Sequence, residues 1–267
     1  ETMLFGRPDR VPLEPGGGRE STMRNWRSQG LPEDVRDVNE YAYRLAGGRL
    51  DWPPAEEWLP VNSRMVPEFE ERVIEKNERT QIVQDWKGNV CEISNDYTVE
   101  YLRTPRDFVT RRWIKFPVGS RKDWEDMRRR YDPADPSRYV ESPAAGGRKE
   151  DRVTALQFSG PFWQLREWLG FENLCLGIAE DPGFVMEMVS FWKDFVSAVL
   201  ERTFRRAVPD VVRISEDIAF KLHAMISPAA ARKFLLPAYR RWGEIIRGAG
   251  CPVYSVDSDG YVDELMP

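Results

Sequence analysis

Two acid-rich segments contain the residues of this sequence that are best suited to chemistry. Residues 213–217 read Arg-Ile-Ser-Glu-Asp after the apolar Val211 and Val212, and residues 254–260 read Tyr-Ser-Val-Asp-Ser-Asp-Gly. Each segment is typical of a strand that ends in carboxylates. Because ligands meet a parallel sheet at the carboxyl ends of its strands, we expect both segments to face one pocket.

Carboxylates in such positions can act as general acid and base, bind a divalent metal, or accept hydrogen bonds from hydroxyl and amine groups of a ligand. Capping of the following helix is the structural alternative for an aspartate in either segment. A cap needs one acid, however, and each segment supplies two. We therefore predict four catalytic residues, and the last two are also the candidate metal ligands: Glu216, Asp217, Asp257 and Asp259.

Other side chains near the expected strand ends are candidates for substrate binding. The arginine that follows Gly16–Gly18 could grip a carboxylate or phosphate with its guanidinium, and the single histidine follows the first acid-rich segment. Ordinary core or solvated positions are the alternatives for the aromatic, histidine and arginine candidates. The glycine is expected to allow a positive φ or a close backbone approach. The predicted substrate-binding residues are Arg19, Phe158, His223, Ser258 and Gly260.

The remaining reactive side chains exclude several classes of site. Cys91, Cys175 and Cys251 are far apart and include no Cys-x-x-Cys spacing, so neither a disulfide framework nor a zinc finger is indicated. With one histidine, a zinc site of nitrogen and sulfur ligands cannot be assembled. We expect the three cysteines to be buried apolar residues.

Composition sets the class of protein. The 267 residues are 41% hydrophobic and 12% aromatic, which suits a large core, and the net charge is -5. Acids and bases are spread along the chain, so no basic stripe indicates nucleic-acid binding. No apolar run approaches the roughly 20 residues that span a bilayer, and the N-terminus has no signal-peptide pattern. These features predict a cytoplasmic location and no membrane partner.

The predicted elements alternate between strand and helix in the second half of the chain. Such alternation indicates a parallel sheet, either closed as a barrel or open and doubly wound. Residues 66–103 interrupt the pattern, and a turn at Lys87–Asn89 predicts a β-hairpin insertion there. The strands expected are Val153–Phe158, Asp210–Ile214 and Pro252–Val256, and the helices are Phe162–Leu169, Pro182–Ala207 and Pro228–Gly248.

Several segments resemble the uroporphyrinogen decarboxylase superfamily, which includes corrinoid-dependent methyltransferases. Arg7–Leu13 resembles the entry to its first strand, Phe158–Trp163 resembles a strand-to-helix turn, and Ser215–Ala219 with Ile226–Pro228 and Phe234–Pro237 resembles the segment around an active-site acid. The resemblance implies that residues 1–267 form a single (β/α)8 barrel, shortened at both ends and incomplete at the C-terminus, with the hairpin inserted.

Two departures from the family pattern bear on the reaction. Decarboxylases of the family carry an arginine pair in a Met-Arg-Gln-Ala-Gly-Arg stretch, where this sequence offers only Arg19 after three glycines. The methyltransferases carry a His-x-Cys-Gly zinc element, and the matching place reads Asp257–Gly260. Carboxylates there favour magnesium, manganese or direct recognition of a ligand over a thiolate-activating zinc ion.

The resemblance therefore implies an enzyme, with methyl transfer from a small methylated substrate to a corrinoid on a partner protein as the leading reaction. Decarboxylation of a porphyrinogen or another carboxylated substrate, by a lyase, is the alternative. A non-catalytic ligand-binding barrel is the third hypothesis, since a fold does not prove a reaction. A divalent metal ion is a further candidate cofactor. Since dimers are common in this superfamily, the resemblance also implies a homodimer.

Overall fold

The computed structural model describes residues 4–7, 17–45, 47, 56–140 and 153–266. The chain divides into two compact units. Unit 1 comprises Glu1–Ala55 and Phe69–Lys115, and unit 2 comprises Glu56–Glu68 and Phe116–Pro267. Arg7 is described, but Pro8–Leu13, which carry most of the segment resembling a first strand, lie outside the described residues.

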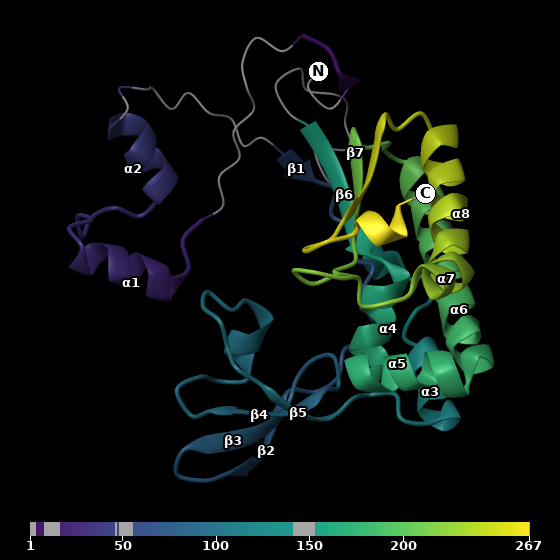
Figure 1. Cartoon of the computed structure of the whole chain (residues 1–267), viewed down its shortest axis with the longest axis horizontal. Helices are drawn as coiled ribbons and strands as arrows, with labels where there is room; N and C mark the ends of the chain where they lie inside the picture. The colour runs from purple at the N-terminus through teal and green to yellow at the C-terminus, as the bar shows by residue number, and fades with distance from the viewer. Residues whose placement is uncertain (1–3, 8–16, 46, 48–55, 141–152, 267) are drawn as a thin grey trace. The chain divides into compact units, whose positions relative to one another are not determined.

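A four-stranded parallel sheet forms the centre of unit 2 (Figure 1). Its order is β1 (Glu56–Trp58), β6 (Val153–Ser159), β7 (Val211–Ser215) and β8 (Val253–Asp257), and each neighbouring pair is parallel. The last three strands match the predicted ones within one or two residues. β1 has only three residues and lies between prolines, so its sequence is too short to show a strand pattern.

Helices fill the long connections that parallel strands require. The sequence marks where they begin: Ser120 and Ser227 each accept a hydrogen bond from a backbone N–H three residues on, and proline follows the caps of three of the helices. The helices of unit 2 are α3 (Arg121–Arg128), α4 (Pro161–Leu169), α5 (Phe171–Glu180), α6 (Pro182–Phe204), α7 (Pro228–Ala230) and α8 (Leu236–Gly248), the last two joined by a π-helical turn at Ala231–Leu235. None of the helices in the described ranges is long and apolar enough to cross a membrane.

Aromatic side chains make up much of the core of unit 2. Trp124, Trp168, Trp192 and Trp242 are each at most 1% exposed. The indole of Trp168 donates to the hydroxyl of Tyr131 at 3.1 Å, and most neighbouring rings meet edge to face. Such pairs add to the stabilisation that burial of their large apolar surfaces supplies. The core therefore lies between the sheet and the helices.

The predicted (β/α)8 barrel is wrong. In the described residues β1 and β8 are the two edges of an open sheet, whereas a closed barrel would pair its first and last strands. The remaining strands form a separate antiparallel sheet and add nothing to the parallel one. Strand and helix alternate in the same way in an open sheet and in a barrel, so the sequence pattern could not separate the two architectures.

Unit 1 contains the antiparallel sheet, in the order β2 (Arg72–Lys76), β3 (Thr80–Gln84), β4 (Val90–Ser94) and β5 (Arg112–Lys115). The predicted hairpin is the β3–β4 pair, and the sheet continues beyond the expected 66–103 range to Lys115. Helices α1 (Glu20–Ser28) and α2 (Val38–Leu45) belong to the same unit, as does a 3-10 helix at Glu100–Arg103.

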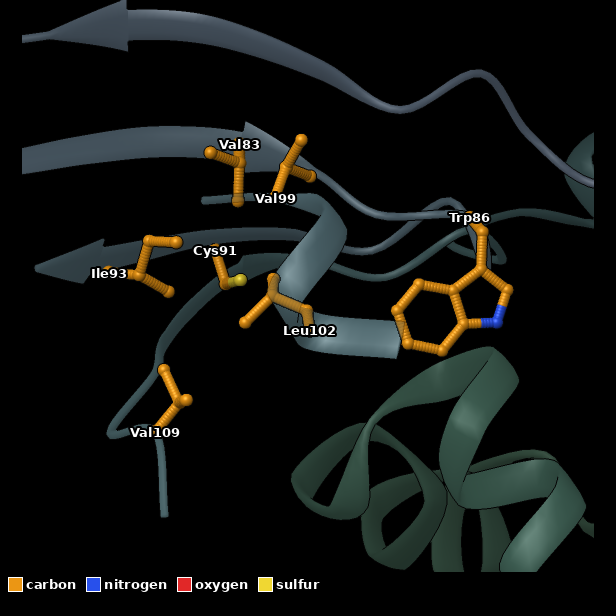
Figure 2. Packing of buried hydrophobic residues seen from close by; sticks show 7 residues of the cluster. All are labelled: Val83, Trp86, Cys91, Ile93, Val99, Leu102 and Val109. Atoms are coloured by element: carbon orange, nitrogen blue, oxygen red, sulfur yellow. The ribbon is translucent and has the colours of Figure 1, made fainter. Parts of the chain in front are cut away.

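Alternate residues of β3 and β4 face a small apolar core (Figure 2). Residues Val83, Cys91 and Ile93 point to the same side and are at most 1% exposed. The segment after β4 covers them with Val99, Leu102 and Val109, and Trp86 completes the cluster. The antiparallel sheet is thus held by one buried face, as is common for antiparallel sheets.

The three cysteines differ in burial, and this difference gives a testable prediction. Cys91 and Cys251 are buried, as expected, while Cys175 is only half-buried. Burial raises the pKa of the Cys91 thiol to about 11. Because the thiolate is the reactive form, iodoacetamide should modify Cys175 first in the native protein, and Cys91 only after unfolding. Mass spectrometry of the alkylated peptides measures the order, and early modification of Cys91 would contradict this packing.

A candidate site on the polar face of the parallel sheet

Three consecutive strands of the parallel sheet carry the same alternating pattern up to their carboxyl ends. The four last residues are Leu-Gln-Phe-Ser in 156–159, Val-Arg-Ile-Ser in 212–215 and Tyr-Ser-Val-Asp in 254–257. In each strand the apolar residues occupy one side and the polar residues the other. This alternation predicts a sheet with one apolar and one polar face.

The register of the strands aligns the polar side chains in two rows. Gln157 pairs with Arg213, which pairs with Ser255. One step nearer the carboxyl ends, Ser159 pairs with Ser215, and Ser215 pairs with Asp257. We call these six residues the polar face: Gln157, Ser159, Arg213, Ser215, Ser255 and Asp257.

The helices lie along the opposite, apolar face (Figure 1). The Phe158 ring packs edge to face on Trp242 of α8, with ring centroids 5.1 Å apart. The hydroxyl of Tyr254 donates to the backbone carbonyl of Tyr239, also in α8, at 3.1 Å. Parallel sheets are usually buried and apolar on both faces, so a face lined by hydroxyl, amide and charged groups needs a reason.

A pocket of about 660 Å³ opens over the carboxyl end of this face. Gln157, Ser159 and Ser215 contribute to its floor, and Arg64 and Glu68 contribute polar groups to its wall. Apolar lining comes mainly from a short segment after β1 and from one further valine: Leu59, Pro60, Val61 and Val140. A volume of this size, with polar and apolar walls, suits a small organic ligand.

Hydrogen bonds hold the side chains of Arg213 and Gln157 in place on the polar face. The guanidinium of Arg213 makes two hydrogen bonds with the carboxylate of Glu56 in β1, one of them at 2.9 Å, and lies over the Trp58 ring. Gln157 donates its side-chain amide to the hydroxyl of Ser215. A site whose side chains already hold their geometry loses little entropy when a ligand binds.

Residues 59–64, which follow β1 and form much of the pocket wall, are called the wall segment here. Arg138 holds this segment in place. It is completely buried, and its guanidinium donates to the backbone carbonyls of Asn62 and Arg64 in the wall segment. It also donates to the carbonyls of Asp132 and Arg130. One side chain therefore joins the segment at residues 62–64 to the loop that follows α3, and burial lowers its pKa.

Glu216, a predicted catalytic residue, is completely buried on the apolar side of the sheet. Its carboxylate accepts hydrogen bonds from the backbone N–H of Trp163 at 2.9 Å and of Phe162 at 3.4 Å, both in the first turn of α4, and from the hydroxyl of Tyr239. α4 has no capping side chain of its own, because Gly160 is its N-cap. The Glu216 carboxylate fills that role from a neighbouring strand end, which favours a positioning role for it.

Gly160 makes room for this carboxylate. A Cβ at residue 160 would lie 2.1 Å from the carboxyl carbon of Glu216, well inside contact distance. The backbone φ of Gly160 is −71°, which any residue can adopt, so space alone requires glycine here. The segments Phe158–Trp163 and Ser215–Ala219 thus meet at this contact.

The Glu216 carboxyl should make the stability of unit 2 depend on pH. Burial raises its pKa to about 7, although the hydrogen bonds from Tyr239, Trp163 and Phe162 and the charge of Arg166 oppose the rise. Because the folded state binds the proton more tightly than the unfolded state, this contribution to stability is complete below the ordinary pKa of glutamate. It is lost as the pH rises through about 7.

Glu216→Gln removes the titrating group and keeps the size and one acceptor. The difference in unfolding free energy between wild type and variant should change by up to about 3 kcal/mol between pH 4 and pH 8, since each pKa unit corresponds to about 1.4 kcal/mol. Urea unfolding across this range measures the difference. A difference that is independent of pH would contradict the assignment.

The second acid-rich segment lies beside the first. The backbone N–H of Asp259 donates to the carboxylate of Asp217 at 3.3 Å, and the hydroxyl of Ser258 accepts from the N–H of Ile218 at 3.0 Å. Gly260 has a φ of +87°, and a Cβ there would lie 2.6 Å from the carbonyl oxygen of Phe220. The positive φ and the close approach predicted for Gly260 are both confirmed.

Asp257 is the one predicted acid that lies in the polar face. It is exposed, at the carboxyl end of β8 and beside Ser215. Asp259 is exposed two residues further on, and no group of three histidine, cysteine or acidic side chains in the described residues could hold a metal ion. The prediction of Asp257 and Asp259 as metal ligands therefore gains no third ligand from these residues.

The other predicted binding residues lie outside the pocket or on its edge. His223 is exposed, with its Nδ1 2.9 Å from a carboxylate oxygen of Glu264. Arg19 belongs to unit 1, where it precedes α1 and its guanidinium lies over the Phe108 ring. Phe158 is buried against α8 and contributes to the pocket lining.

Sequence reasoning missed most of the polar face. Gln157, Ser159, Arg213, Ser215 and Ser255 were available as a signal, because polar residues occupy the same alternate positions in three successive strands. In the sequence, Val153–Phe158 is predicted only as a strand, without a distinction between its two faces. The wall segment after β1 carries no periodic pattern that could have placed it over the sheet.

Comparisons of the chain with protein-family models, with curated proteins and with solved structures give no match.

Proposed function

We propose that unit 2 is the substrate-binding part of an enzyme that transfers a methyl group from a small methylated substrate, with a corrinoid partner protein as acceptor. The observation that carries the proposal is the polar face beneath a pocket of about 660 Å³. The reaction type comes from the resemblance of residues 158–163 and 215–219 to the uroporphyrinogen decarboxylase superfamily. A cytoplasmic location and a homodimer belong to the same proposal.

The pocket offers both kinds of contact that a methylated substrate needs. Leu59, Pro60, Val61 and Val140 provide apolar surface for methyl groups. Ser159 and Ser215 in the pocket lining, and Asp257 beside Ser215 in the next strand, provide groups that can hydrogen-bond the polar atoms of such a substrate.

In this proposal Glu216, on the apolar side of the sheet, holds in place the strand end that carries Ser215. It follows Ser215 directly and fixes the end of β7 to the first turn of α4. The buried carboxyl therefore sets the position of the hydroxyl on the opposite face. A corrinoid partner would supply the methyl acceptor, and no residue of this chain is assigned to hold it.

Porphyrinogen decarboxylation is the weaker alternative. The acidic side chains of such a substrate call for several free cations, and on the polar face Arg213 is already paired with Glu56. Arg64 is the other guanidinium at the pocket. A non-catalytic binding module would use the same pocket and would bind ligand without turnover.

Formation of methylcobalamin from reduced cobalamin tests the proposal. The full chain is incubated with reduced cobalamin and a panel of methylated amines, ethers and thiols, and the visible spectrum reports methylcobalamin. We expect transfer from at least one donor, and a loss of at least tenfold in Ser215→Ala with the same melting temperature. Absence of transfer from every donor, together with carbon dioxide release from a carboxylated porphyrinogen, would replace the proposal with decarboxylation.

A further inference from the structure

The charges around the polar face indicate which substrates the pocket accepts. Three carboxylates lie on this face or line its pocket, at Glu56, Glu68 and Asp257, against two guanidiniums at Arg64 and Arg213. The balance is a net charge of −1. The charged residues in the pocket lining, Arg64 and Glu68, balance each other. Glu56 balances Arg213, so the excess is the carboxylate of Asp257 beside the pocket. A carboxylate there raises the local concentration of cations and disfavours anions.

Of the two guanidiniums, that of Arg213 is already paired and is not free to bind a ligand. Arg213 is bound in a two-point ion pair, and the Glu56 carboxylate that holds it is only 11% exposed. That pair presents little net charge to a ligand. The carboxylate of Asp257, in contrast, is at the exposed end of β8, and the described residues donate no hydrogen bond to it.

Serine hydroxyls follow Asp257 in its row of the polar face. Ser215 is its direct neighbour in the row, and adjacent strands lie about 4.8 Å apart, so a ligand of a few atoms can reach both side chains. Ser159 follows on the next strand and also lines the pocket. A ligand that fits has a cationic group for Asp257 and a hydroxyl or ether oxygen for the two serines.

From this arrangement we propose that the polar face binds a small methylated amine that also carries an oxygen, with its ammonium group at Asp257 and its oxygen at Ser215 and Ser159. The inference rests on the proposed function, because it names the substrate class of the same pocket. The apolar lining at Leu59, Val61 and Val140 would take the methyl groups. An ammonium that keeps one proton can donate it to the Asp257 carboxylate, which strengthens the contact.

Two nearly isosteric probes separate charge from shape. 2-(Dimethylamino)ethanol is cationic at neutral pH, and 3-methylbutan-1-ol has carbon in place of its nitrogen. Glycolate serves as a small anion with a hydroxyl. Isothermal titration calorimetry with the full chain at low salt should show at least tenfold tighter binding of the amine than of either other probe, with the preference falling at high salt.

Two variants test whether Asp257 causes the preference for the amine. Asp257→Asn should remove most of the preference for the amine and leave 3-methylbutan-1-ol unchanged. Asp194→Asn is the matched control, because this exposed aspartate lies on α6, which covers the apolar side, and its loss should change nothing. Equal affinity for the amine in wild type and Asp257→Asn would refute the assignment of Asp257.

Failure of this inference is distinguishable from failure of the proposed function. If glycolate binds more tightly than the amine and Ser215→Phe abolishes that binding, the pocket is a substrate site but not one for amines. If Ser215→Phe leaves the binding of every probe unchanged, the polar face is not the site, and both proposals fail.

Discussion

Gly160→Ala should destabilise unit 2 by at least about 2 kcal/mol, because a methyl group there has no space in a packed interior. The new Cβ would lie 2.1 Å from the carboxyl carbon of Glu216, which is held by two backbone N–H groups of α4 and by Tyr239. Neither side can retreat without breaking these hydrogen bonds. Urea unfolding followed by tryptophan fluorescence measures the loss.

Two further variants make the reason for this loss testable. Gly248→Ala is the control, since nothing lies within 4 Å of a Cβ there, and it should be neutral or stabilising. In a Glu216→Ala background the clash disappears, so adding Gly160→Ala should cost at least about 1 kcal/mol less than in the wild type. Equal costs in the two backgrounds would show that the contact with Glu216 is not the cause.

Arg138→Ala should cost about 3 to 5 kcal/mol, because it empties a buried site and leaves backbone carbonyls without their donor. The guanidinium is 0% exposed and donates to four backbone carbonyls, those of Asn62, Arg64, Arg130 and Asp132. Two of these lie in the pocket wall. Ligand binding should therefore weaken in proportion to the loosening of that wall.

A nearby arginine provides the comparison. Arg129 is exposed and, in the part of the chain that the structure describes, pairs with Asp126 one helical turn away, so Arg129→Ala should change the unfolding free energy by less than about 0.5 kcal/mol. Arg138→Lys keeps the charge but cannot reach four carbonyls at once, and it should recover only part of the loss. A loss below about 1 kcal/mol in Arg138→Ala would contradict the role given to this residue.

Local features of the sequence predicted much of unit 2. The strand signals at 153–158, 210–214 and 252–256 correspond to β6, β7 and β8, and the helices predicted at 162–169 and 182–207 correspond to α4 and α6. These features depend on neighbouring residues, which a sequence displays directly. The alternation of strands and helices also predicted the parallel sheet.

Closure of the sheet could not be predicted, because it depends on which strands become neighbours. β1 pairs with β6 although almost a hundred residues separate them in the chain. Its three residues, Glu-Glu-Trp, contain one strand-favouring side chain and lie between prolines, which is too little for a strand to be predicted. The packing that holds β1, including the ion pair between Glu56 and Arg213, exists only in the folded chain.

The sequence indicated the carboxyl ends of β7 and β8 as a place for a site, but it did not indicate the other residues of the polar face. Carboxylates at the ends of β7 and β8 were expected, and Asp257 does lie beside the pocket floor. Glu216 lies on the other face because it is one residue beyond Ser215, and successive residues of a strand point to opposite sides. The same rule, applied to the serines, would have found the polar face.

Chemical labelling shows whether the polar face opens on a pocket, and it needs no knowledge of the substrate. Ser215→Cys is prepared in a Cys175→Ser background, treated with a small thiosulfonate reagent in the native state, and analysed by intact mass. We expect rapid formation of a single adduct at residue 215, slowed by 2-(dimethylamino)ethanol, while the buried Cys91 and Cys251 stay unmodified. A thiol at 215 as unreactive as Cys91 would show that the polar face does not open on a pocket, and the proposed function would fall with it.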